Sequence, residues 1–125
     1  MKKDIETQAD VKLLVDTFYA QVLKDDVIGF IFTDVAKISM EKHMPIMYSF
    51  WEAILLGNNG YQGNPMSKHF MLNKKTPLLP QHFERWKELW FKTLEELFEG
   101  ERATEAKTRA NTIAYLMETK MKQAQ

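Results

Sequence analysis

Two stretches decide how this chain can fold, HMPIMYSFW (residues 43–51) and GNPMSKH (residues 63–69). In the first stretch, His43 stands at the start of an apolar, aromatic-rich segment that predicts a helix. In the second, His69 lies in a short segment between two prolines, Pro65 and Pro77. Neutral imidazole is the commonest protein ligand for a metal. Two such groups on either side of an apolar cleft could hold a haem.

The composition favours one ordinary helical domain and excludes several classes of protein. The chain has 125 residues, 45% of them hydrophobic, and 17 basic residues balance 17 acidic ones. A zero net charge argues against a nucleic-acid partner, and no apolar run reaches the length of a membrane span. The absence of cysteine excludes disulfides and thiolate chemistry. We therefore expect a single cytoplasmic domain over residues 1–125, with no signal peptide.

Apolar periodicity predicts four long helices and no strand. The expected helices cover residues 10–24, 43–56, 80–98 and 103–121. A shorter helix is expected from Asn64 through His69 to about Leu72, because Asn64-Pro65 is a typical helix start. Pro45 lacks an N–H, so the second helix is expected to begin at or just after His43, with residues 33–41 in a loop or irregular helix.

Each residue that could carry chemistry also has a plain structural interpretation. His69 could be an axial iron ligand or a partly exposed histidine with no role. His43 shares a helical face with Met47 and could line a pocket, and His82 near a helix N-terminus is expected to be neutral. Tyr19 and Trp86 could donate hydrogen bonds to a bound ligand or could be core residues. The sequence contains no tight zinc-ligand spacing, phosphate loop or nucleophile motif.

Taken together in this order, these residues resemble the truncated haemoglobins, specifically group III. The resemblance extends from about residue 13 to residue 114. The chain lacks the Gly-Gly motifs of other truncated globins, which fits group III. The matching blocks are Phe18-Tyr19, residues 29–32, His43-Met44-Pro45 with Phe50-Trp51, residues 61–66 with His69, Pro77-Leu78, residues 82–86 and residues 109–114.

The resemblance implies an all-α fold, a two-over-two helical sandwich enclosing haem b. In that arrangement His69 is the proximal iron ligand and Phe32 packs on the haem. Tyr19, His43 and Trp86 match the family's distal residues, and Met47 and Trp51 would help to exclude water from the haem. Lys68 and Arg85, with His82 as a further candidate, would hold the haem propionates.

The implied function is binding of dioxygen or nitric oxide, with a distal pocket whose polarity and donors decide what happens to the ligand. Two donors favour oxygen or nitric oxide chemistry over bulk oxygen transport. Nitric oxide dioxygenation would need a separate reductase, because the chain has no flavin or nicotinamide domain. Two alternatives stay open at this point: a peroxidase-like haem enzyme using the same site, and a haem-free globin-like module that binds a protein partner.

Overall fold

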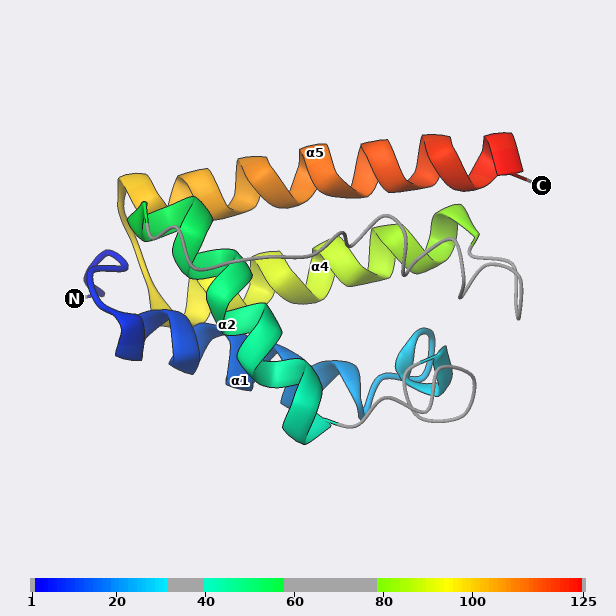
Figure 1. Ribbon diagram of the computed structural model, residues 1–125. Coiled ribbons are helices and arrows are strands. Elements are labelled where there is room, and N and C mark those ends of the chain that lie inside the picture. Colours follow the sequence, from blue (N-terminus) through cyan, green and yellow to red (C-terminus); the bar gives the residue numbers. More distant parts are fainter. Residues whose placement is uncertain (1, 32–39, 58–78, 125) are drawn as a thin grey trace.

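The computed structural model describes residues 2–31, 40–57 and 79–124, and every regular element within them is helical (Figure 1). The long helices are α1 (Gln8–Val22), α2 (Met40–Leu56), α4 (Pro80–Leu97) and α5 (Glu101–Ala124). Helix α1 packs against both α2 and α4, α4 lies along α5, and α2 also contacts α5. None of these described helices is both long and apolar enough to cross a membrane. The all-helical prediction is confirmed.

Helix α1 begins with a capping box that the periodicity alone did not locate. The Thr7 hydroxyl accepts a hydrogen bond from the Asp10 N–H at 3.2 Å, and the Asp10 carboxylate accepts from the Thr7 N–H at 3.1 Å. Each side chain thus satisfies one of the N–H groups that a helix start leaves unpaired. The helix therefore starts at Gln8, two residues before the predicted start.

Helix α2 starts earlier than predicted. It begins at Met40 and continues through Pro45, so the predicted start at or just after His43 is wrong. A proline at this place removes one intrahelical bond, the bond to the carbonyl of Glu41. Glu41 is exposed, so water can satisfy that carbonyl. The predicted end is confirmed, because Gly57 follows the helix with a φ of +72°, the left-handed conformation that glycine adopts easily.

The face between α4 and α5 combines large side chains with small ones. Ala103, Ala106, Ala110 and Ala114 form a buried stripe along α5. Such small residues let another helix approach closely, and Trp90 of α4 donates its indole N–H to the Ala106 carbonyl at 3.2 Å. The predicted start of α4 at residue 80 is confirmed, and its predicted end at 98 and the predicted bounds of α5, 103–121, differ from the observed ones by one to three residues.

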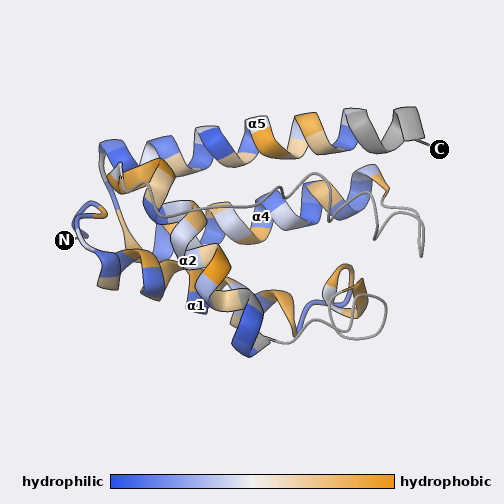
Figure 2. Cartoon of the chain, viewed as in Figure 1, coloured by the Kyte–Doolittle hydropathy of each residue, from blue (hydrophilic) through white to orange (hydrophobic). Residues whose placement is uncertain are grey.

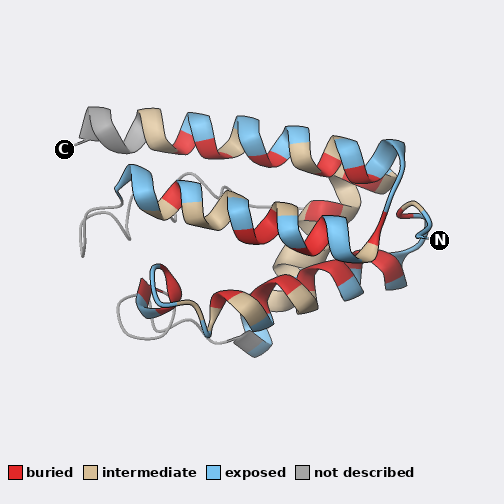
Figure 3. Cartoon of the chain, turned by 180° about the vertical axis from the view of Figure 1, so that it is seen from behind, coloured by how far each residue is buried: buried red, intermediate tan, exposed pale blue. Residues whose placement is uncertain are grey.

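The buried core lies where α1 faces its neighbours. Figure 3 shows that the buried sides of α1, α4 and α5 turn inward, and Figure 2 shows the matching change from hydrophilic to hydrophobic around each helix. Five side chains of α1 are at most 1% exposed: Val11, Leu14, Val15, Phe18 and Val22. Because α1 contacts both α2 and α4, its buried face connects the two helices that carry the aromatic residues of the site.

Candidate functional site

An aromatic cluster joins α1, α2 and α4. The rings of Trp51 and Trp90 stack with centroids 4.4 Å apart and an interplanar angle of 25°. Trp86 lies parallel to Trp90 one helical turn away, with centroids 6.4 Å apart. Phe18 meets Trp90 edge-on at 4.9 Å and Trp86 at 6.1 Å. Edge-to-face and offset-stacked pairs are the favourable geometries for aromatic rings, so this cluster gives the three helices a defined relative position.

Tyr19 brings a buried phenol to this cluster. It lies near the end of α1, is 7% exposed, and packs edge-on against Phe18 with ring centroids 4.9 Å apart. Burial raises the pKa of Tyr19 above its ordinary value, because the phenolate would lose its hydration. The phenol therefore stays protonated at physiological pH and keeps its O–H as a donor.

Trp86 adds a second donor from α4. Its side chain is partly buried and packs against the core. An indole can donate a hydrogen bond and cannot accept one. Phe18 contacts both Tyr19 and Trp86, so the two residues that the sequence identified as candidate donors pack edge-on against the same phenylalanine ring.

Helix α2 contributes the apolar side of the site. Met47 and Trp51 lie one turn apart on this helix; Trp51 is buried, and Met47 is partly buried against the core. His43 lies in the first turn of α2, four residues before Met47. The His43 side chain lies outside the described residues, as do His69, Phe32, Lys68 and the predicted helix from Asn64 to Leu72.

Arg85, a candidate partner of the haem propionates, already forms ion pairs with two carboxylates of the protein. Arg85 binds the Asp25 carboxylate through Nε and Nη2, both at 2.7 Å from Oδ1, and Nη1 lies 3.0 Å from Glu88. The buried partner of this pair, Asp25, received no role in the sequence analysis. The signal for it was present, since an aspartate just after a helix end commonly accepts bonds from the following backbone N–H groups.

His82 is held in a defined tautomer. Its Nδ1 accepts a hydrogen bond from the Leu79 N–H at 3.0 Å, so Nε2 carries the proton of the neutral ring. Burial lowers the pKa of His82, in agreement with the neutral imidazole expected from its place at the helix start. Its ring packs edge-on against Phe30 with centroids 6.0 Å apart.

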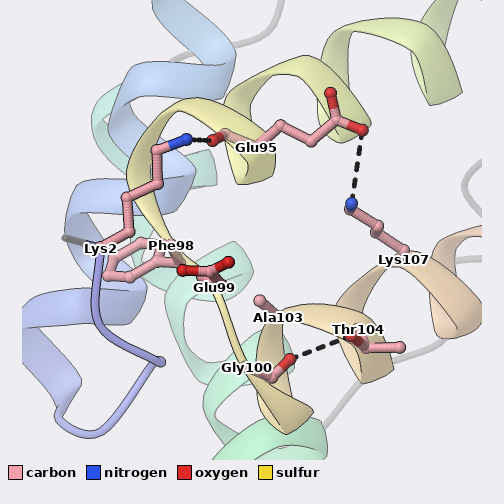
Figure 4. Close-up of a pocket in the computed structure, with 8 residues that line it drawn as sticks. All are labelled: Lys2, Glu95, Phe98, Glu99, Gly100, Ala103, Thr104 and Lys107. Carbon is pink, nitrogen blue, oxygen red and sulfur yellow. Dashed lines mark hydrogen bonds and ion pairs between the residues drawn. The ribbon is translucent and has the colours of Figure 1, made fainter.

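A separate pocket lies at the α4–α5 turn and shares no residue with the aromatic cluster (Figure 4). Its volume is about 250 Å³, and polar side chains such as Lys2, Glu95 and Lys107 surround it. Lys107 is paired with Glu95 at 3.4 Å, and Lys2 donates to the Glu95 carbonyl. Within the described ranges, no three His, Asp or Glu side chains gather in a way that could hold a metal ion.

The helical arrangement and the aromatic cluster between α1, α2 and α4 define a protein of the globin class. Residues 3–122 match the family described as bacterial-like globin, and the chain belongs to that family. It is similar to the group 3 truncated hemoglobin ctb of Campylobacter jejuni, with 33% identity over 118 residues that cover 91% of this chain and 90% of the relative.

The solved structures give the same result. The fold is similar to the crystal structure of a group III truncated hemoglobin from Campylobacter jejuni, with a TM-score of 0.82 and 27% identity. The match covers 97% of this chain and 95% of the other. The predicted truncated-globin fold and the resemblance to group III are therefore confirmed.

Proposed function

We propose that this chain is a haem protein in which His69 holds the iron of haem b and Tyr19 and Trp86 face a small diatomic ligand. Membership of the globin family supports haem binding. The observation that supports the distal assignment is the pair of donors, a buried phenol and a partly buried indole, in contact with the same Phe18 ring.

The described side chains suit a flat apolar cofactor that carries a polar ligand. Met47, Trp51 and Phe18 supply apolar surface, and Tyr19 and Trp86 supply an uncharged phenol and an uncharged indole as donors. An apolar wall excludes water, while donors in a site of low polarity form stronger hydrogen bonds than they do in water. Haem, when bound, would supply the iron chemistry that dioxygen or nitric oxide needs.

Each distal residue then has a separate task. The protonated Tyr19 hydroxyl donates a hydrogen bond to the ligand, and the Trp86 indole N–H donates a second one. Each bond contributes about 1 kcal/mol. Met47 and Trp51 keep water away. His43, one turn before Met47 in the sequence of α2, would act as a distal gate, as a further donor or as a sixth iron ligand in the ligand-free state.

The residues proposed to bind the propionates differ in how many of their donor groups are already bound within the protein. Arg85 uses Nε and Nη2 on Asp25, whose side chain is 4% exposed, whereas Nη1 contacts the exposed Glu88. An exposed ion pair of this kind contributes little, so Nη1 is the part of Arg85 that could exchange Glu88 for a propionate. The Nε2–H of His82 is a further donor, and Lys68 is the remaining candidate.

The two donors favour retention of the ligand, and hence chemistry on dioxygen or nitric oxide, over oxygen delivery. Nitric oxide dioxygenation would draw its electrons from a separate reductase. Steady-state turnover with nitric oxide and a reductase, compared with turnover of hydrogen peroxide, distinguishes this activity from a peroxidase-like one.

The primary test is the visible spectrum of the purified protein with added haem. A Soret band is expected in the wild type, and its loss in His69→Gly with recovery on adding imidazole would assign the proximal ligand. No Soret band in the wild type would instead favour a haem-free interaction module. His82→Gly is the histidine control, because it removes a candidate propionate partner and not the proposed iron ligand, and its Soret band is expected to remain.

The distal assignment is tested by the rate at which dioxygen leaves the ferrous protein. Tyr19→Phe removes one donor while keeping the ring, so loss of about 1 kcal/mol should accelerate dissociation roughly fivefold or more. An unchanged dissociation rate would refute this role for Tyr19.

A further inference from the structure

A second tyrosine, on α2, is paired with a carboxylate of α1. Tyr48 of α2 donates its phenolic O–H to Oδ1 of Asp16, which lies on α1 32 residues earlier in the chain. The Nζ of Lys12 lies 5.9 Å from the centroid of the Tyr48 ring. Burial, together with the hydrogen bond to Asp16 and the charge of that carboxylate, raises the pKa of Tyr48 to about 12. At neutral pH the phenol is thus protonated and already directed at a base.

A row of indoles approaches this pair from α4. Trp86 and Trp90 are parallel, with an interplanar angle of 2°, and Trp90 stacks on Trp51 of α2. Tyr48 lies three residues before Trp51 on α2, which places the two side chains one turn apart on neighbouring positions of the helix surface. The stacked rings of Trp86, Trp90 and Trp51 therefore run from α4 to α2, and Trp51 lies one helical turn from Tyr48.

The chemistry of these side chains suggests more than packing. Indole and phenol rings give up a single electron more readily than any other aromatic side chain. A phenol that loses an electron becomes strongly acidic and must release its proton, so it needs an acceptor within hydrogen-bond distance. Asp16 supplies that acceptor, and the positive charge of Lys12 near the ring disfavours a cationic intermediate that keeps the proton.

We propose that Tyr48 is a one-electron oxidation site with Asp16 as its proton acceptor, reached from Trp86 through Trp90 and Trp51. In the step, an oxidant takes one electron from Tyr48, the phenolic O–H bond breaks, and a new O–H bond forms on Asp16 Oδ1. The products are a neutral tyrosyl radical, a protonated carboxyl group and the reduced oxidant. A small reductant such as ascorbate returns the electron, and the proton moves back from Asp16 to the phenol.

Two oxidants are named for this step. One is hydrogen peroxide acting through bound haem, and this arm rests on the proposed function. The other is a photoexcited ruthenium polypyridyl complex with persulfate, which acts from solvent and needs no haem. The chain has four tyrosines, so both arms use a background with Tyr61→Phe and Tyr115→Phe, in which Tyr19 and Tyr48 are the remaining ones.

The measurement is electron paramagnetic resonance of samples frozen soon after mixing or illumination, with ring-deuterated tyrosine to distinguish tyrosyl from tryptophanyl radicals. A tyrosyl signal is expected in the background protein in both arms, and it should be lost in Tyr48→Phe. Asp16→Asn keeps an acceptor oxygen but cannot take up the proton, so the tyrosyl yield should fall and the tryptophanyl share should rise. Trp90→Phe should lower the yield in the peroxide arm and leave the photochemical arm unchanged.

An equal tyrosyl yield in Tyr48→Phe and in the background would overturn the proposal, since Tyr19 would then be the site. A yield that Asp16→Asn does not alter would overturn the role of Asp16. If the chain binds no haem, the proposed function and the route from Trp86 both fail, and the photochemical arm alone decides whether Tyr48 and Asp16 form a redox pair.

Discussion

The guanidinium group of Arg85 and the carboxylate of Asp25 form a partly buried ion pair that joins α4 to the turn after α1. Both Nε and Nη2 lie 2.7 Å from Oδ1, and the Asp25 side chain is 4% exposed. The second oxygen, Oδ2, accepts the N–H groups of Val27 and Ile28 at 3.0 and 3.1 Å. Since Trp86 follows Arg85 directly and Tyr19 precedes Asp25 by six residues, this pair fixes the two elements that carry the proposed donors.

The first prediction concerns removal of this carboxylate. Asp25→Ala leaves the Arg85 guanidinium with only its exposed partner Glu88 and removes an acceptor from two backbone N–H groups. Loss of hydrogen bonds to a charged group should lower the free energy of unfolding by about 2–3 kcal/mol. Urea denaturation followed by circular dichroism measures this change.

Two controls accompany that measurement. Asp26→Ala alters the adjacent, exposed aspartate and should change the free energy of unfolding by less than about 0.5 kcal/mol. Glu88→Ala breaks only the exposed contact of Arg85 and should also have a small effect. Equal effects of Asp25→Ala and Asp26→Ala would show that the Asp25–Arg85 pair does not stabilise the fold.

The second prediction is a loss of stability in acid that depends on Asp10. Burial opposes its charged form, but the hydrogen bond from Lys3 and those from the Glu6 and Thr7 N–H groups outweigh burial and lower the pKa of Asp10 to about 2. A folded-state pKa below the unfolded value of about 3.9 gives stability that is present above that value and lost as the pH falls toward 2. The contribution is about 2 kcal/mol.

Urea denaturation between pH 7 and pH 2 tests this prediction. The wild type should lose stability across the acid range, and Asp10→Asn should show a smaller loss because its side chain has no proton to take up. The pKa values of Asp25 and Asp4 are also lowered, so part of the acid dependence should remain. A wild-type profile that matches that of Asp10→Asn would contradict the assignment.

Much of the fold could be predicted from the sequence because apolar residues at helical spacing give the helices directly. The ends of helices were less predictable, since they depend on single hydrogen bonds. The Thr7–Asp10 capping box places the start of α1 two residues before the predicted one. Because α2 continues through Pro45, it starts at Met40, before the predicted start at His43. Apolar periodicity does not register the hydrogen bonds of the cap, and the usual effect of proline on a helix does not register that water can satisfy the carbonyl left without a partner. Both depend on the folded chain.

The candidate site was predictable to a different degree. Tyr19, Trp51, Met47 and Trp86 all belong to the hydrophobic core or pack against it, but the roles that the resemblance to the truncated haemoglobins implies for them around a haem stay a prediction. The Asp25–Arg85 and Asp16–Tyr48 pairs join residues 60 and 32 positions apart. No periodicity in a single sequence connects such distant partners, so their pairing could come only from the structure.

The third prediction separates two tryptophans that are one turn apart on α4. Trp90 is 1% exposed, donates to the Ala106 carbonyl and stacks on Trp51, so Trp90→Phe should lower the free energy of unfolding by about 2 kcal/mol. Trp86 is partly buried and is proposed to face the ligand. Trp86→Phe should therefore have a smaller effect on stability and should accelerate dissociation of dioxygen. Urea denaturation and dioxygen dissociation are measured for both variants. A larger loss of stability in Trp86→Phe, or a faster dissociation only in Trp90→Phe, would refute the prediction.

The fourth prediction concerns the turn between α4 and α5, where the chain start supplies a missing helix cap. Gly100 precedes α5 and has no side chain, and Asp4 accepts the Arg102 and Ala103 N–H groups in its place, each at 3.0 Å. A Cβ on Gly100 would lie 2.6 Å from the Asp4 Cγ, and the φ of Gly100 is +140°. Gly100→Ala should therefore displace Asp4 and lower the free energy of unfolding by about 2 kcal/mol or more, from the lost cap and the strained backbone.

The same turn offers a control and a double-mutant cycle that separate the cap from the backbone strain. Gly57→Ala also places a side chain at a positive φ, +72°, but its Cβ would meet no described atom within 4 Å, so its effect should be about 1 kcal/mol. Asp4→Gly removes both the cap and the obstructing side chain. In that background Gly100→Ala should therefore destabilise less than it does in the wild type, because the cap is already lost. Additive effects, measured by urea denaturation, would show that Asp4 and Gly100 act independently, and an unchanged stability of Asp4→Gly alone would show that the cap does not stabilise the fold.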